Sequence, residues 1–307
     1  TLSINGLSVN ENSKNACVTN GKLYYELSGD NSLCICAVSL NSDEQAYVVK
    51  EYVSEYNYYE RISLYTIEDK IYVNWLSGVS ADKNLYYIEQ IDISTDKVSR
   101  LCDMNEKYPE ISSTIINWNS ETYFDKDGNL YFTCVDKDNY IVKKLNISTG
   151  DIKDLYVQEL QHEKDYGYVH LKNYDGKYIY IYKGVNMMAL SGKSLDEKFK
   201  KYDNYIYILD TDGNIKDTVI LNNTDEKASG NISAEFYGGD ERCLLIGFSA
   251  HDIKGLELSE EEQNLRIKLE DELFKNKKGI VNVNVSAILD KSQIGSGNIT
   301  LEPVTPE

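Results

Sequence analysis

An internal repeat constrains the fold of this chain more than any other feature of its sequence. A turn followed by a strongly apolar and aromatic segment recurs as NGKLYYELS from Asn20, EDKIYVNWLS from Glu68, DGNLYFTCV from Asp127, DGKYIYIYK from Asp175 and GDERCLLIGFS from Gly239. Spacings of 48, 59, 48 and 65 residues separate the aligned positions Leu23, Ile71, Leu130, Tyr178 and Cys243. Turn residues followed by apolar and aromatic runs predict β-hairpins.

A second element recurs in phase with the first. An apolar residue followed by Asn or Asp precedes a polar cluster at Leu40–Asn41, Ile91–Asp92, Leu145–Asn146, Leu209–Asp210 and Leu289–Asp290. Asn and Asp side chains bond their own backbone two residues on, so these clusters predict turns at strand ends. With an incoming strand before and a short strand after, each repeat is a unit of four antiparallel strands.

Four-stranded units at this period are typical of β-propeller blades. The chain is therefore predicted to be an all-β, single-domain propeller over residues 1–307, with segment 1–9 as an extra strand. The five repeats predict blades over 14–54, 61–104, 118–157, 168–221 and 230–304. A sixth, degenerate blade in the gaps 104–118 or 184–203 stays open.

One segment of the last blade has a helical pattern instead. Ser259 and Glu262 form a capping box, and Leu265, Leu269 and Leu273 recur at four-residue intervals. This predicts an amphipathic helix inserted over 259–278. Its apolar stripe must pack on something, either the propeller's own face or a partner protein.

The charge of the chain limits its partners. Fifty acidic residues against 32 basic ones give a net charge of −18. Such a surface repels phosphate backbones and anionic lipid, so we expect no nucleic-acid or membrane-surface partner. No apolar run approaches the roughly 20 residues that a transmembrane helix needs, so no transmembrane segment is predicted.

The cysteines and the acidic turn at Asp125 offer little support for a metal or cofactor. All six cysteines lie in apolar alternating runs, which predicts unpaired, buried thiols. Asp125 and Asp127 alternate around Gly128 like the start of a calcium loop, but Asp136 stands where such a loop needs Glu. We therefore interpret the stretch as a hairpin turn, with calcium as the alternative, and predict no cofactor.

Candidate ligand-binding residues gather in the predicted loops between blades. Amphipathic rings there suit stacking on a sugar or a peptide, and inter-blade packing is the alternative role. A histidine in the predicted innermost strand of the fourth blade joins them. The predicted ligand-binding set is Tyr56, Tyr58, Tyr59, Trp118, Tyr166, Tyr168 and His170.

Support for catalysis is weaker than support for binding. Glu121, Asp125 and Glu235 lie on predicted inner strands, and converging carboxylates are what a glycoside hydrolase needs. None of them lies in a catalytic motif, and the chain has no nucleophile elbow, zinc motif or phosphate loop. We therefore predict no catalytic residue and favour a non-enzymatic binding or scaffold protein. A propeller glycoside hydrolase or other hydrolase, with its site at the channel mouth, is the alternative.

The IYVNWLSG segment followed by YYIEQIDIST resembles the YWTD-type and TolB-like propeller repeats. The chain is also similar to uncharacterised propeller lipoproteins exported by low-GC Gram-positive bacteria. The resemblance implies a propeller exported to the cell surface or the extracellular space, with an unknown protein, peptide or glycan as partner. The chain begins at Thr1 without Met, so we expect either a processed protein or a truncated chain, with a leader already removed, and a lipid anchor stays open.

Overall fold

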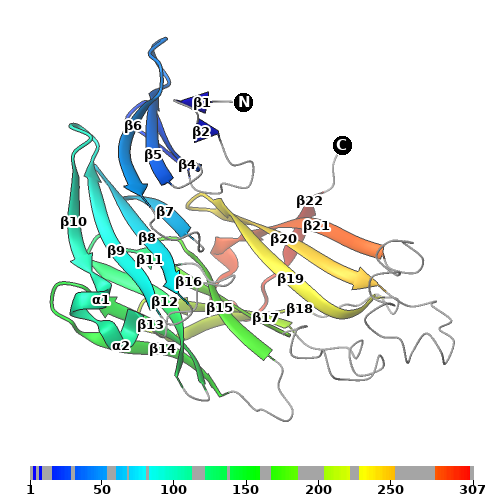
Figure 1. Ribbon diagram of the computed structural model, residues 1–307. Helices are drawn as coiled ribbons and strands as arrows, with labels where there is room; N and C mark the ends of the chain where they lie inside the picture. Colours follow the sequence, from blue (N-terminus) through cyan, green and yellow to red (C-terminus); the bar gives the residue numbers. More distant parts are fainter. Residues whose placement is uncertain are drawn as a thin grey trace, which may run out of the picture. The chain divides into compact units, whose positions relative to one another are not determined.

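The chain is an all-β, five-bladed propeller of four-stranded antiparallel sheets, so the predicted fold class is confirmed (Figure 1). Helices in the described part of the chain are only short. The computed structural model describes residues 3–4, 7–8, 16–28, 32–53, 60–67, 69–80, 83–112, 122–136, 139–159, 167–185, 204–221, 228–252 and 281–304. The helix predicted over 259–278 lies outside these residues.

The first two blades come from the N-terminal third of the sequence. Blade one contains β3 (Ala16–Thr19), β4 (Lys22–Ser28), β5 (Ser32–Ser39) and β6 (Tyr47–Val53). Blade two contains β7 (Glu60–Ile67), β8 (Lys70–Ser80), β9 (Lys83–Asp92) and β10 (Val98–Asp103). Two short helices follow, α1 (Met104–Lys107) and α2 (Pro109–Ser112).

The other three blades repeat the same strand order. Blade three contains β11 (Tyr123–Phe124), β12 (Asn129–Asp136), β13 (Asn139–Asn146) and β14 (Ile152–Glu159). Blade four contains β15 (Gly167–Tyr174), β16 (Tyr178–Val185), β17 (Asn204–Asp210) and β18 (Ile215–Leu221). Blade five contains β19 (Ala228–Gly239), β20 (Cys243–Asp252), β21 (Val281–Asp290), the 3₁₀ turn η2 (Lys291–Gln293) and β22 (Leu301–Val304).

The extreme N-terminus adds to the first sheet. The short strands β1 (Ser3–Ile4) and β2 (Leu7–Ser8) pair with each other, and Ser8 of β2 pairs with Ser28 of β4. Because β3 pairs with the other end of β4, two separate segments share one edge of that strand. The predicted extra strand is thus a small hairpin of the first blade, and the four strands of the fifth blade all come from the C-terminal part of the chain.

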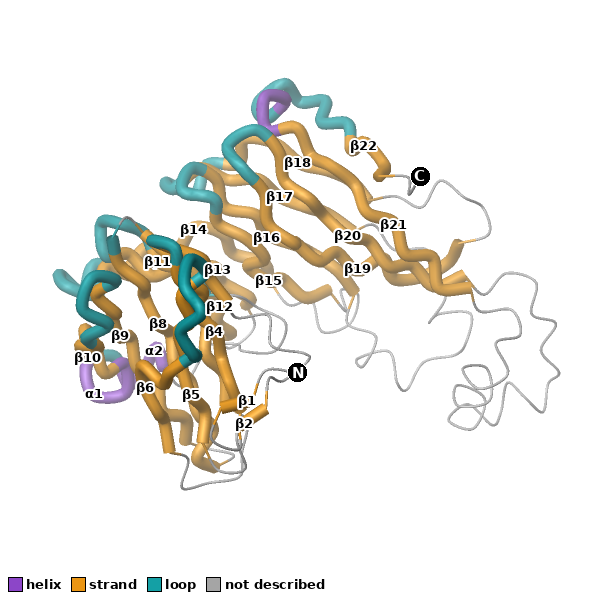
Figure 2. The backbone as a smooth tube through the Cα atoms, turned by 90° about the horizontal axis from the view of Figure 1, so that it is seen from above, coloured by secondary structure: helices purple, strands orange, loops and turns teal. Residues whose placement is uncertain are grey.

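The chain divides into two compact units, each with its own core. The first contains residues 1–116, 122–134 and 144–152, and the second contains 117–121, 135–143 and 153–307. In the first unit, Tyr24 and Ile35 of blade one pack with Ile71 and Ile91 of blade two. In the second unit, blades four and five lie side by side (Figure 2), and their facing sheets share one buried cluster that is lined by Tyr180, Tyr182, Ile206, Ile208, Ala234, Leu244, Ile246 and Leu289.

The turns after the third strand of the blades share one chemistry. The side chain of Asp92 accepts hydrogen bonds from the backbone N–H groups of Ser94 and Thr95. The acceptors Asn146, Asp210 and Asp290 do the same for backbone groups two to four residues further on. These bonds satisfy the backbone where the ladder ends, which confirms the predicted turns at these four positions.

The hairpin between β11 and β12 settles the role of Asp125. Its carboxylate accepts hydrogen bonds from the N–H groups of Asp127 and Asn129, from the Asn129 amide and from the Tyr131 hydroxyl. Gly128 takes φ of +78°, which an L side chain rarely adopts. The interpretation of this stretch as a turn is therefore confirmed, and Asp125 serves the hairpin.

The cysteines are free thiols, and the predicted burial holds for four of the six. Cys34, Cys36, Cys102 and Cys134 are buried, and Cys17 and Cys243 are half-buried. Burial raises the pKa of Cys36 to about 12 and so keeps the thiol protonated, with its neighbour Cys34 contributing in the same direction. These side chains therefore pack as small hydrophobes.

Candidate functional site

The candidate site begins on β15, the first strand of blade four. Val169 and Leu171 are fully buried, and the alternate residue His170 lies opposite Tyr182 of β16. The register with β16 shifts between Leu171 and Asn173, so Lys172 is the extra residue of a β-bulge. A bulge interrupts the strict alternation of a strand, and all four residues from Val169 to Lys172 are buried, so both faces of this strand are covered.

His170 is an almost fully buried imidazole. Its residue is only 7% exposed, and its Nδ1 has no hydrogen-bond partner among the residues that the structure describes. Burial, followed by the nearby positive charge of Lys172, lowers the pKa of His170 from its ordinary 6.5 to about 3. The imidazole is therefore neutral at physiological pH and can act as either a donor or an acceptor at Nδ1, depending on its tautomer.

Lys172 joins this histidine to blade five. Its ammonium Nζ lies 3.5 Å from Oε1 of Glu235 on β19, at the long end of hydrogen-bond distance. The Lys172 side chain is 7% exposed, whereas the Glu235 side chain is 47% exposed. The carboxylate thus reaches solvent while the ammonium is buried behind it.

Aromatic rings complete the cluster. The Tyr168 ring lies 4.6 Å from the His170 ring, with 54° between their planes, and 5.8 Å from the Tyr182 ring. The Tyr182 hydroxyl donates to Oδ1 of Asn204 at 3.2 Å, and both residues are fully buried. Burial, followed by the neighbouring Tyr168, raises the pKa of Tyr182. We call Tyr168, His170, Lys172, Tyr182, Asn204 and Glu235 the His170 cluster.

Sequence analysis predicted only some of the residues in this cluster. The structure brings together Tyr168 and His170 from the predicted ligand-binding set, and it adds Glu235 from the predicted inner-strand carboxylates. The remaining candidates Tyr56, Tyr58, Tyr59, Trp118, Tyr166 and Glu121 lie outside the described residues. Sequence reasoning missed Lys172, because a lysine between Leu171 and Asn173 in a strand is expected to reach solvent.

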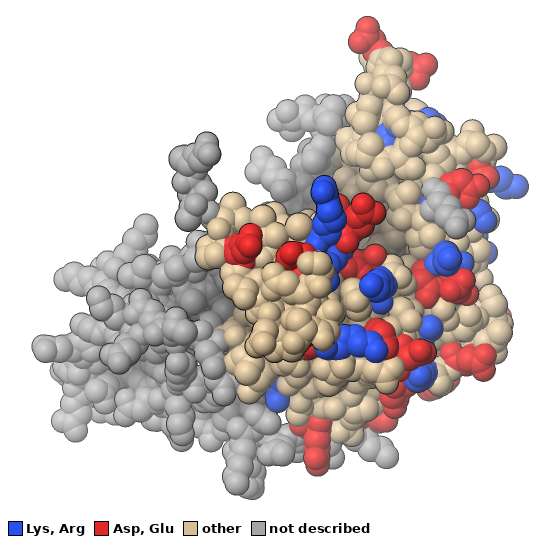
Figure 3. Space-filling view, turned by 180° about the vertical axis from the view of Figure 1, so that it is seen from behind, with Lys and Arg blue, Asp and Glu red and all other residues tan. Residues whose placement is uncertain are grey.

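The described part of the chain gives no support for a metal site or a membrane-spanning helix. Within it, no group of three or more His, Cys, Asp or Glu residues is arranged to hold a metal ion. None of the helices there is long and apolar enough to cross a membrane. On the face shown in Figure 3, acidic and basic side chains are interspersed, so the acidic excess does not form one continuous patch there.

The chain is thus a five-bladed β-propeller, and the His170 cluster lies on β15, β16 and β17 of blade four and on β19 of blade five. No protein-family model matches the chain, and no curated protein matches it. The chain is similar to solved structures at low identity. Prolyl oligopeptidase B from Galerina marginata matches with a TM-score of 0.48 at 14% identity, over 94% of this chain and 33% of that one.

Two further structures show the same level of similarity. The subtype N10 neuraminidase-like protein of A/little yellow-shouldered bat/Guatemala/060/2010 has a TM-score of 0.41 at 11% identity, over 78% of this chain and 74% of that one. The endo-arabinase from Bacteroides thetaiotaomicron VPI-5482 has a TM-score of 0.38 at 12% identity, over 79% and 89%. This chain spans about a third of the prolyl oligopeptidase, and the fold assignment rests on its own five blades.

Proposed function

We propose that this chain is a non-enzymatic binding or scaffold protein whose peptide, protein or glycan ligand contacts the His170 cluster. The observation that carries the proposal is the buried Nδ1 of His170, which lacks a partner among the described residues. Leaving a buried polar atom unsatisfied costs about 1–3 kcal/mol, so such atoms need an explanation. A ligand that displaces the groups covering this atom would satisfy it, and the half-exposed Glu235 marks the side of the cluster that solvent reaches.

We also propose that the protein is exported and acts at the cell surface or outside the cell. Support comes from the resemblance to YWTD-type and TolB-like repeats and to exported propeller lipoproteins. The segments that carry it form a complete strand pair, since IYVNWLSG lies in β8 and YYIEQIDIST spans most of β9 and the turn after it. Antibody labelling of intact cells tests this location, and labelling only after lysis would contradict it.

Histidine-selective NMR tests the binding site directly. The chain has only three histidines, so ¹⁵N-histidine labelling gives few signals, and the loss of one set in His170→Asn assigns that residue. Ligands found on glycan and peptide arrays should shift the His170 signals. Tyr168→Leu should weaken binding about tenfold or more, as expected for the loss of about 1.4 kcal/mol. Tyr174→Leu, at the far end of the same strand, should have no effect.

The same ligands separate binding from hydrolysis. Each ligand is incubated with the protein, and its products are followed by mass spectrometry. We expect the ligand to be recovered intact. Turnover by the normal chain that disappears in Glu235→Gln would replace the binding function with hydrolysis at this cluster, and unshifted His170 signals with every bound ligand would place the binding surface elsewhere.

A further inference from the structure

We infer that the His170 cluster binds a neutral, polyhydroxylated sugar residue, with the Lys172–Glu235 pair hydrogen-bonded to its hydroxyl groups. This inference rests on the proposed binding function and names the chemistry of its ligand. The cluster combines a buried ammonium, a half-exposed carboxylate 3.5 Å away, an imidazole whose buried Nδ1 lacks a partner among the described residues, and a half-buried tyrosine ring.

The balance of charge favours a neutral ligand. Lys172 and Glu235 carry opposite charges and are paired, while His170 and Tyr182 are uncharged at neutral pH. An anionic ligand would meet the carboxylate of Glu235 on the exposed side, within a protein whose net charge is −18. A cationic ligand would be placed next to the buried ammonium of Lys172. Like charges at close range disfavour either case.

The hydrogen-bonding capacity of the cluster matches hydroxyl groups. An ammonium only donates, an ionised carboxylate only accepts, and a neutral imidazole does one or the other at each nitrogen. A hydroxyl group does both, so neighbouring hydroxyls on one sugar can donate to Glu235 and accept from Lys172.

The tyrosine ring supplies the apolar part of the contact. Tyr168 is only half-buried, and its position is fixed by contacts with the His170 and Tyr182 rings. A rigid aromatic face beside a few convergent polar groups is the usual composition of a small-molecule site. The apolar C–H face of a sugar ring can pack against the part of the Tyr168 ring that Tyr182 and His170 leave uncovered.

Matched probes test the chemistry. Cellobiose, xylobiose and mannobiose are titrated into the ¹⁵N-histidine-labelled chain, together with the corresponding uronate disaccharide and a neutral capped tripeptide. We expect at least one neutral disaccharide to shift the His170 signals, and the uronate to bind about tenfold more weakly or less. Binding should be nearly unchanged between about 50 and about 500 mM NaCl, because no net charge is neutralised.

Substitutions that keep the side-chain size test the residues. Lys172→Met and Glu235→Gln should each weaken disaccharide binding about tenfold, and Lys153→Met and Asp212→Asn provide the matched control. Those two residues form an exposed ion pair in the same unit, with 3.8 Å between Lys153 Nζ and Asp212 Oδ1. Thermal unfolding of each variant shows whether it is folded, and Glu235→Gln keeps the test valid if Lys172→Met does not fold.

The outcomes separate this inference from the proposed function. A peptide that shifts His170 while every neutral disaccharide leaves it unchanged would overturn the sugar assignment and keep the binding function. Stronger binding of the uronate than of its neutral partner would also overturn the sugar assignment. Failure of every probe and array ligand to shift His170 would overturn both, and would make the cluster a structural contact between blades four and five.

Discussion

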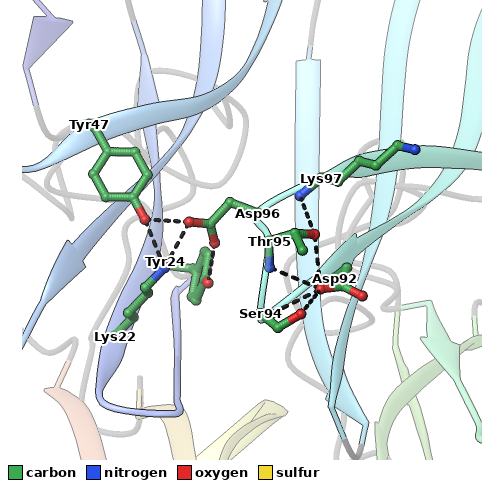
Figure 4. Close-up of polar contacts among 8 residues, drawn as sticks. All are labelled: Lys22, Tyr24, Tyr47, Asp92, Ser94, Thr95, Asp96 and Lys97. Atoms are coloured by element: carbon green, nitrogen blue, oxygen red, sulfur yellow. Dashed lines mark hydrogen bonds and ion pairs between the residues drawn. The ribbon is translucent and has the colours of Figure 1, made fainter.

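Contacts among Lys, Tyr and Asp side chains connect blade one to blade two, and also blade four to blade five. The two junctions differ in which blade contributes the Asp. At the first, Lys22 and Tyr24 of blade one bond to Asp96 in a turn of blade two (Figure 4). At the second, Asp175 of blade four takes a hydrogen bond from Tyr180 of its own blade and an ion pair from Lys291 of blade five. The carboxylate therefore comes from the following blade in one case and from the preceding blade in the other.

The two junctions differ in how deeply their charges are buried. The Lys22 and Asp96 side chains are 27% and 20% exposed, whereas Lys291 and Asp175 are both 10% exposed. The distance between the charged atoms is the same, 2.7 Å in each pair. Because a buried charge depends far more on its partner than an exposed one does, the second junction should be the more sensitive to the loss of its carboxylate.

The carboxylate at the first junction occupies an unusual backbone position. Asp96 has φ of +54°, and the matching turn of blade three has Gly150 there, at +82°. Burial alone would raise the pKa of Asp96, but hydrogen bonds from Lys22, Tyr24 and Tyr47 outweigh it and hold that pKa below its ordinary value. A residue that favours other backbone conformations is thus kept in place by its side-chain contacts with blade one.

Asp175→Asn should give the largest effect. The substitution removes the carboxylate from the buried ammonium of Lys291, and the free energy of unfolding should fall by about 3 kcal/mol, as for a broken buried ion pair. Urea denaturation of the full chain measures it. Asp212→Asn, which removes the acid of an exposed ion pair in the same unit, is the control and should cost less than about 1 kcal/mol. Equal losses in the two variants would contradict the ranking by burial.

Asp96→Asn should give a smaller loss at the first junction. Asparagine tolerates the positive φ, so the change removes mainly the charge-assisted bonds from Lys22, Tyr24 and Tyr47. The expected loss is about 1.5 kcal/mol in the same denaturation experiment. Asp96→Gly introduces the residue that blade three has at the matching position, Gly150, and should lower the free energy of unfolding by a similar amount. If the glycine variant were more stable than the normal chain, backbone strain would outweigh the contacts with blade one.

The sequence predicts the blades better than the junctions, for a physical reason. Hairpin turns and strand ends depend on neighbours a few residues away, so the five aligned positions from Leu23 to Cys243 all lie in the second strands β4, β8, β12, β16 and β20. The junction contacts join Lys22 to Asp96 and Asp175 to Lys291 across long stretches of chain. A charge can be contributed by either blade, so these contacts leave no fixed motif in the repeat.

The candidate site shows the same limit. Tyr168 and His170 could be proposed because aromatic and imidazole side chains at a strand start suit a ligand. Lys172 could not, because a lysine in a strand is expected to reach solvent, whereas both faces of β15 are buried here, and its partner Glu235 lies in another blade. Such pairings depend on how neighbouring blades pack, and a single sequence carries no direct signal for that packing.

As the pH falls, the second unit, which contains His170, should lose stability before the first unit does. The folded-state His170 pKa of about 3 lies below the ordinary 6.5, so between these values the unfolded chain binds a proton that the folded chain excludes. Stability from this residue is complete above pH 6.5 and falls by about 1.4 kcal/mol per pH unit as the pH drops toward the folded value. The lowered pKa of Asp96 also makes the stability fall as the pH drops, but only below the ordinary pKa of 3.8.

Hydrogen exchange followed by NMR at pH 7, 6 and 5 can resolve this difference, after correction for the intrinsic pH dependence of exchange. We expect amides of β15 and β16 to lose protection from pH 6 downward, while amides of β4 and β9 keep theirs. In His170→Asn the pH dependence of β15 and β16 should disappear, because asparagine does not titrate. Equal loss of protection in both units of the normal chain would mean that His170 is not the group that makes the second unit acid-sensitive.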